Sequence, residues 1–153
     1  MKKEPHLSPN QLIEEAKALL TQLVKSQEEG DLSLFESCFL HTEELVNIGT
    51  DLDEIWYGWD DFSRFMKNAI TERKGHKIQE LDTRIVVDEG GTTAWYSQLI
   101  DTCIETKSEP FRLEGFRHTG VMIFRNGQWR IAQSHISAPI IVNLEQDGMD
   151  ALE

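Results

Sequence analysis

The stretch FRHTGVMIFRNGQWRIAQSHISAP, residues 116–139, decides the fold of this chain. It alternates polar and apolar residues on both sides of the pair Asn126-Gly127, which is typical of two antiparallel strands joined by a tight turn. The same two-residue period runs through residues 93–105 and through the segment that begins at His76. Four long strands in succession predict an antiparallel meander in the C-terminal half.

The N-terminal half has the helical period of 3.6 residues instead. Ser8 and Gln11 have the spacing of a capping box, and Pro9 suits the first turn of the helix that they begin. Gly30 is the expected end of this helix. Asp31 then begins a short second helix over the sequence LSLFES.

Two further elements separate these helices from the long strands. ELVNIGTDLDEIWYG, residues 44–58, has two short apolar runs around a turn-rich centre and predicts a hairpin. A third helix is expected over roughly residues 59–73, where apolar residues recur at helical spacing. In the first long strand, Ile78 is out of phase with the residues that follow, so we expect a bulge near Gln79 and Glu80.

This order of elements indicates the α+β class. Long, bulged strands curl a sheet, so we expect a curved, mostly antiparallel sheet that forms a half-open cone capped by three N-terminal helices. Such a cone leaves a cavity for a small ligand. One domain is expected over residues 1–153, with its core at about 8–140 and an acidic, frayed tail at 143–153.

The composition restricts the partners. With a net charge of -12 and an isoelectric point near 4.8, the chain repels phosphate backbones and anionic lipids, so we expect neither nucleic acid nor a membrane. The N-terminus lacks the pattern of a secretory signal. Cys38 and Cys103 lack metal-ligand spacing, which favours a reduced, cytoplasmic setting and no metal site. Because the Walker, G-x-G-x-x-G and G-x-S-x-G motifs are missing from the sequence, we expect no cofactor.

Three blocks of the sequence carry a family resemblance. VNIGTDLDEIWYGWDDFSRFMK (residues 46–67), TAWYS (residues 93–97) and the stretch at 116–139 resemble the SnoaL-like domains of the nuclear transport factor 2-like, or cystatin-like, superfamily. The last block is also similar to the association domain of calcium/calmodulin-dependent kinase II. The resemblance implies a cone-shaped fold, usually dimeric, with a pocket that needs no metal. The superfamily includes ketosteroid isomerase, scytalone dehydratase and polyketide cyclases, and also members without a known reaction.

The register of the last hairpin decides which histidine faces the pocket. A two-residue loop pairs Arg125 with Gln128 and places His118 directly opposite His135. A three-residue loop pairs Phe124 with Gln128 instead, and it separates the two histidines onto opposite faces of the sheet.

We favour the three-residue loop for two reasons. It aligns branched residues of one strand with Trp129 and Ile131 of the other. The resemblance to the kinase association domain also implies that the positions of Gly120 and Ile136, which match pocket arginines of that domain, both face the pocket. These two positions share a face only in that register. His118 then points into the cone, whereas the other histidine lies on the outer face, where a structural or interface role is expected.

The resemblance at residues 93–97 places Ser97 toward the pocket, and Asp101 follows on the same side of its strand. A buried aspartate needs a partner, and His118 on the neighbouring strand is within plausible reach. An aspartate–histidine pair suits a general acid or base, although a purely structural hydrogen bond at the rim of the cone remains the alternative. The residues expected to line the pocket are Trp95, Ser97, Leu99, Phe116, Gly120, Met122, Ser134 and Ile136, with Trp56 and Trp59 at its mouth.

Two classes of function follow. The first is a cofactor-free lyase, isomerase or cyclase that binds a small, largely apolar organic molecule, with Asp101 and His118 moving a proton. The second is a non-catalytic ligand-binding or association module. In either case the resemblance implies a homodimer formed through the outer face of the sheet.

Overall fold

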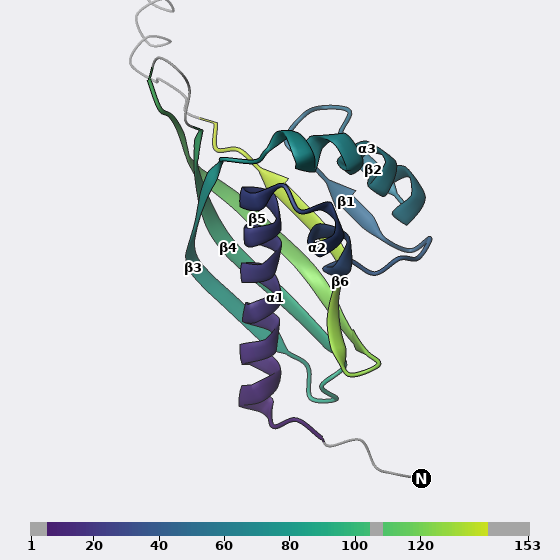
Figure 1. Cartoon of the computed structure of the whole chain (residues 1–153). Helices are drawn as coiled ribbons and strands as arrows, with labels where there is room; N and C mark the ends of the chain where they lie inside the picture. Colours follow the sequence, from purple (N-terminus) through teal and green to yellow (C-terminus); the bar gives the residue numbers. More distant parts are fainter. Residues whose placement is uncertain (1–5, 105–108, 141–153) are drawn as a thin grey trace, which may run out of the picture.

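The computed structural model describes residues 6–104 and 109–140, so the predicted acidic tail at 143–153 lies outside the described residues. Helices precede a sheet of long strands, as predicted (Figure 1). The helices are α1 (Pro9–Glu29), α2 (Leu32–Ser37) and α3 (Trp59–Glu72), and the strands are β1 (Val46–Ile48), β2 (Ile55–Tyr57), β3 (Lys77–Val87), β4 (Thr93–Ile104), β5 (Phe111–Arg125) and β6 (Gln128–Ser137).

The six strands form one open sheet in the order β2-β1-β6-β5-β4-β3. Neighbouring strands are antiparallel except for β1 and β6, which are parallel. Figure 1 shows α1 crossing one face of this curved sheet, with α2 and α3 beside it toward the β1–β2 hairpin. The predicted α+β class with helices gathered on a mostly antiparallel sheet is therefore confirmed.

The start of α1 is fixed by local hydrogen bonds. The Ser8 hydroxyl accepts from the Gln11 amide at 3.2 Å, and the Gln11 side chain accepts from the Ser8 amide at 2.8 Å. Gly30 ends the helix in a left-handed conformation with a φ of 66°, which a residue without a Cβ adopts readily. The capping box and the end of the helix are confirmed as predicted.

The core lies between the helices and the inner face of the sheet. An aromatic cluster forms its centre, with the rings of Phe35 and Phe39 4.9 Å apart and those of Phe39 and Phe62 5.1 Å apart. The indole nitrogen of Trp129 donates to the Leu12 carbonyl at 3.0 Å and so ties β6 to the beginning of α1. Each large apolar side chain buried in this core contributes roughly 1.5–3 kcal/mol to folding.

The turn between β5 and β6 differs from the three-residue loop that we favoured. Arg125 pairs with Gln128, and the two residues between them, Asn126 and Gly127, have φ angles of 53° and 76°. Positive φ at both central residues defines a type I′ turn, which Asn-Gly strongly favours. The predicted pairing of Phe124 with Gln128 is therefore wrong.

The shift of register lies farther along β6, at Ala132. Met122 pairs with Ile131, but Val121 pairs with Gln133, so Ala132 is left without a partner on β5. At this point β6 also changes its other neighbour, from the segment around Phe39 to β1. The extra residue is a β-bulge, and it reverses which side chains of β6 point inward.

The bulge gives the two histidines the faces that were predicted. His118 pairs with Ile136 and is buried, whereas His135 pairs with Thr119 and is exposed. The predicted orientation is confirmed, although it arises from an extra residue inside β6 and not from the turn.

The predicted phase of β4 is wrong. Trp95 and Leu99, which were expected to point inward, are 50% and 39% exposed, and Ser97 between them is exposed too. Both alternating sets of this strand contain large apolar side chains, so the pattern alone does not distinguish the faces. The buried residues of β4 are Ala94, Tyr96, Gln98 and Ile100.

The bulge predicted in β3 is present, but it lies farther along the strand. The register shifts between Leu81 and Arg84, where Asp82 has a φ of 49°, and not at Gln79 and Glu80. The shift puts Ile78 on the same inner face as Ile85 and Val87 although it is out of phase with them in the sequence, which was the reason for expecting a bulge.

Candidate ligand-binding site

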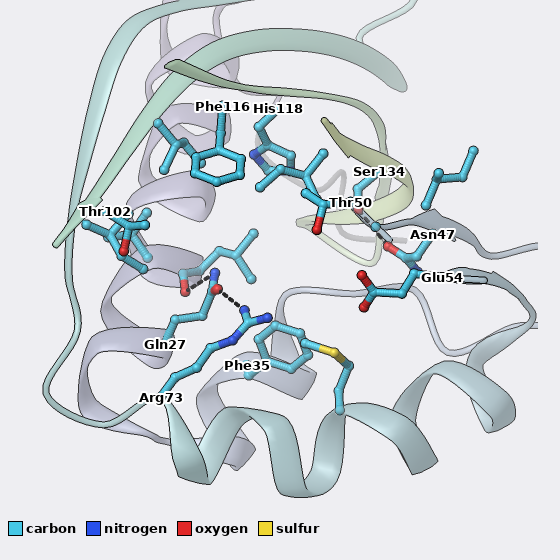
Figure 2. Close-up of a pocket in the computed structure, with 18 of the residues that line it drawn as sticks. Gln27, Phe35, Asn47, Thr50, Glu54, Arg73, Thr102, Phe116, His118 and Ser134 are labelled. Atoms are coloured by element: carbon cyan, nitrogen blue, oxygen red, sulfur yellow. Dashed lines mark hydrogen bonds between the residues drawn. The ribbon is translucent and has the colours of Figure 1, made fainter. Parts of the chain in front are cut away.

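A cavity of about 300 Å³ lies between the helices and the inner face of the sheet (Figure 2). Its volume is at the lower end of the range typical of small-molecule sites. Most of its wall is apolar, with contributions from α1, α2, α3 and all four long strands. The apolar wall includes Leu23, Phe35, Phe62, Met66, Ile100 and Phe116.

His118 forms part of the sheet wall of this cavity and is held on both ring nitrogens. Nε2 lies 3.1 Å from the hydroxyl of Tyr96, and Nδ1 lies 3.2 Å from the amide nitrogen of Gln98. The Thr83 hydroxyl donates to the Gln98 amide oxygen at 2.9 Å, which leaves the amide nitrogen of Gln98 to donate to Nδ1. In this arrangement the proton of the neutral ring is on Nε2.

The electrostatic state of His118 follows from its burial. Desolvation lowers the pKa of His118 from 6.5 to about 4, so the ring is neutral at pH 7. Burial also raises the pKa of Tyr96, which keeps its hydroxyl protonated. A histidine with such a low pKa and two occupied nitrogens is a weak base, and its geometry suits a fixed polar point in the cavity wall.

Asp101 does not contact His118, so the predicted pair is wrong. Its two carboxylate oxygens accept from the Arg112 guanidinium at 3.1 Å and from the Gly115 amide at 2.9 Å. The register between β4 and β5 shifts between Ile100 and Thr102, so Asp101 has no partner across the ladder and turns toward the beginning of β5. Its charge is satisfied there by an arginine, away from the cavity.

The other predicted site residues divide into two groups. Phe116, Ser134, Ile136 and Trp56 line the cavity together with His118, and their contact with a ligand stays a prediction. The remaining residues lie elsewhere in the fold. Trp95, Ser97 and Leu99 are on the outer face, Gly120 and Met122 are buried without lining the cavity, and Trp59 stacks on His41 with 3.9 Å between ring centroids.

The charged end of the cavity was missed by the sequence analysis. Arg73, the C-cap residue of α3, donates from Nη1 to the Gln27 side chain at 2.6 Å. Figure 2 shows its guanidinium pointing into the cavity, with the Glu54 carboxylate on the far side. Burial lowers the pKa of Arg73, and the charge of Glu54 raises it in part. The signal was available, because Arg73 continues the apolar stripe of α3 seven residues after Met66.

A second polar group lies where β1 meets β6. The Ser134 hydroxyl donates to the Asn47 side-chain oxygen at 2.6 Å, and the two residues are partners in the parallel ladder. The Asn47 amide nitrogen is buried and has no hydrogen-bond partner within the described parts of the chain. An unsatisfied buried donor costs about 1–3 kcal/mol, so a ligand oxygen at this position would be stabilised.

Other chemistries find little support in residues 6–104 and 109–140. Within these ranges, no group of three or more His, Cys, Asp or Glu side chains is arranged to hold a metal ion. Among the same residues, no helix combines the length and the apolar character needed to cross a membrane. Burial raises the pKa of the Cys38 thiol to about 12, which makes it unreactive at neutral pH.

Comparison with known families agrees with this architecture. The model of the SnoaL-like domain family matches residues 16–141, so the chain belongs to this family. A sequence search of curated proteins gives no significant match.

Solved structures share the fold at low sequence identity. A proposed dehydratase of the NTF2-like family from Streptomyces avermitilis has a TM-score of 0.76 and 14% identity, and the match covers 88% of this chain and all of that one. A proposed calcium/calmodulin-dependent protein kinase II association domain from Xanthomonas campestris has a TM-score of 0.68 and 18% identity, covering 84% and 88%. A proposed ketosteroid isomerase from Shewanella frigidimarina has a TM-score of 0.64 and 16% identity, covering 82% and 97%. These identities establish the fold alone.

Proposed function

We propose that this protein binds a small, largely apolar organic molecule in the cavity between its helices and its sheet. The observation that carries the proposal is the cavity itself, about 300 Å³ in volume, with apolar walls and a few polar groups at defined positions. Protein interiors are normally close-packed, and an empty apolar cavity lowers stability. A bound apolar molecule would restore the missing contacts.

The geometry supports ligand binding better than proton transfer by the predicted pair. Asp101 is bound to Arg112, and His118 is a weak base with both nitrogens engaged. Two solved structures with this fold are described as a proposed dehydratase and a proposed ketosteroid isomerase, so a cofactor-free lyase, isomerase or cyclase is the second candidate. In such an enzyme Glu54 would be the carboxylate that faces the substrate, because it lines the cavity and Asp101 does not.

Cavity binding is tested with neutral one- and two-ring ketones, such as 1-tetralone and 2-acetylnaphthalene. We expect at least one of them to raise the melting temperature and to give a saturable signal in titration calorimetry. Ile100→Trp fills the cavity and should abolish binding, with Ile136→Trp as a second filling variant. Leu99→Trp is the matched control, because this neighbour of Ile100 lies on the outer face. If the cavity-filling variants bind as well as the control, or if no compound binds the unaltered protein, the proposal is wrong.

We also propose that the outer face of the sheet forms a homodimer. Trp95, Leu99 and Val86 are exposed there on neighbouring strands, and Trp95 is the register partner of Val86. Contiguous exposed apolar side chains are typical of an interface. Trp95→Lys should shift the mass in sedimentation equilibrium toward the monomer. Leu52→Lys, at an exposed apolar residue outside this face, should leave it unchanged, and a monomeric unaltered protein would refute the proposal.

A further inference from the structure

We infer that the natural ligand carries a single carboxylate, which Arg73 binds at the charged end of the cavity. This inference rests on the proposed function and gives it a chemical class. It is carried by the position of one guanidinium: it faces the cavity, it is partly buried, and it lacks an acidic partner within the described residues.

Arg73 forms no ion pair with an acidic side chain of the described residues. Arg64, Arg84 and Arg112 each form an ion pair with an acidic side chain at 3.6 Å or less. Among the described residues the Arg73 guanidinium hydrogen-bonds to the Gln27 side chain and to no carboxylate, and the charge of Glu54 acts on it without direct contact. Acids are not scarce, since the sequence has 27 of them against 15 basic residues. Arg117, Arg125 and Arg130 also lack an ion pair within the described ranges, but of these four arginines it is Arg73 that lines the cavity.

The position of Arg73 in the helix does not explain its direction. The helix dipole favours a basic residue at the C-cap of α3, but the neighbouring Lys74 can interact with the dipole while its side chain stays exposed to solvent. Arg73 instead extends inward, where partial loss of water makes a charge costly, and Glu54 offsets that cost only in part. An anion in the cavity would offset that cost.

The form of the guanidinium and its surroundings select the class of anion. A guanidinium has five N–H donors in a planar fork that matches a carboxylate with two parallel hydrogen bonds, and Gln27 occupies only one nitrogen. Glu54 lies across the cavity without contacting Arg73, so a dianion or a second acidic group would meet its negative charge. The apolar remainder of the wall fits a hydrocarbon body. Together these features select an apolar monocarboxylate.

The test compares two probes of nearly equal shape, 2-naphthoic acid and 2-naphthamide, by titration calorimetry at pH 7. The unaltered protein should bind the acid about ten- to hundredfold more tightly than the amide, as expected for a charge-assisted contact. Arg73→Gln should reduce this preference to about one by weakening binding of the acid far more than binding of the amide, and Arg73→Lys, which keeps the charge without the fork, should give an intermediate ratio. Lys74→Gln is the matched control and should retain the full preference.

Glu54→Gln is an independent test, with an expected effect in the opposite direction. Removal of its negative charge should strengthen binding of the acid several-fold, because the repulsion across the cavity is lost. Equal binding of both probes by the unaltered protein, or a preference unaffected by Arg73→Gln, would overturn the carboxylate inference and leave cavity binding intact. If neither the probes nor the ketones bind, both the inference and the proposed function are refuted.

Discussion

The side-chain amide of Gln98 lies 3.2 Å from Nδ1 of His118, on directly opposed positions of β4 and β5. The Thr83 hydroxyl on β3 donates to the oxygen of that amide, and the Tyr96 hydroxyl hydrogen-bonds to Nε2 of the ring. Four polar side chains from three strands thus form one chain of hydrogen bonds along the sheet wall of the cavity. Such a chain stabilises the neutral histidine and fixes its orientation.

The low pKa of His118 makes stability depend on pH. In the unfolded chain this histidine takes up a proton near pH 6.5, whereas in the folded protein it does so only near pH 4. The stability that the neutral ring contributes is therefore fully present above pH 6.5 and is lost as the pH falls toward 4. Between pH 7 and pH 5 the loss from this group should be roughly 2 kcal/mol. Urea unfolding of the unaltered protein and of His118→Gln at both pH values measures it, because other groups titrate alike in both. Equal losses in the two proteins would contradict the prediction.

Gly120 should not tolerate a side chain. A Cβ at this position would collide with the Tyr96 hydroxyl and with the Gln133 carbonyl, and the carbonyl belongs to a sheet that cannot easily move. Gly120→Ala should therefore lower the free energy of unfolding by about 2 kcal/mol or more. Gly90→Ala is the control, because its Cβ would lie 3.4 Å from the Asp88 carboxylate in a turn. Equal losses of stability in the two variants would contradict the prediction, because they would show that the close approach of the Gln133 carbonyl to Gly120 does not determine the cost.

Asp101 and His118 should behave as independent residues. Asp101→Asn and His118→Phe are expected to have additive effects on stability within about 0.5 kcal/mol, since the two side chains have different partners. Gln98→Leu combined with His118→Phe should show a coupling of about 1 kcal/mol, because these residues are in contact. The two double-mutant cycles are measured by chemical denaturation, and a strong coupling in the first would restore the predicted pair.

The capping box should contribute measurably to stability. Ser8→Ala removes the acceptor for the Gln11 amide and should destabilise the protein by about 1 kcal/mol. Ser63→Ala, in the first turns of α3, removes only an exposed hydrogen bond to the Asp60 carbonyl and should change stability by less than about 0.5 kcal/mol. Thermal unfolding of both variants tests the difference, and a neutral Ser8→Ala would show that the α1 terminus frays without cost.

The parts of the fold that could be predicted are those set by nearby residues. Ser8 and Gln11 meet three positions apart, so the sequence contains the whole cause of the capping box. Asn126-Gly127 also determines its own turn, and our prediction was wrong there because we gave more weight to cross-strand alignment and to the family resemblance than to this local signal. The site depended on contacts between distant segments. Arg73 meets Gln27 across 46 positions, and no local pattern indicates that these two side chains share a cavity.

The prediction of which β4 side chains point inward was wrong for a different reason. Trp95 is large and apolar, as is Tyr96 beside it, so hydrophobicity gives both faces of the strand equal support. What decides between them is the fit of Tyr96 against His118 and of Ala94 beneath the helices. Both of these contacts are properties of the assembled layers.

The unpaired residue Ala132 divides β6 into two parts, in which opposite sets of alternate side chains point inward. The ladder skips Ala132, so Ser134 and Ile136 line the cavity although they are out of phase in the sequence with Trp129 and Ile131, which are buried before the bulge. Deleting Ala132 alone would make the pairing of β5 and β6 regular and would leave Ser134 inward and His135 outward. Closing the bulge without a deletion would instead shift the residues beyond it by one position, so that His135 would turn inward and Ser134 outward. An alignment of relatives therefore assigns the residues after Ala132 to the correct face only if a missing bulge is matched by a gap of one residue.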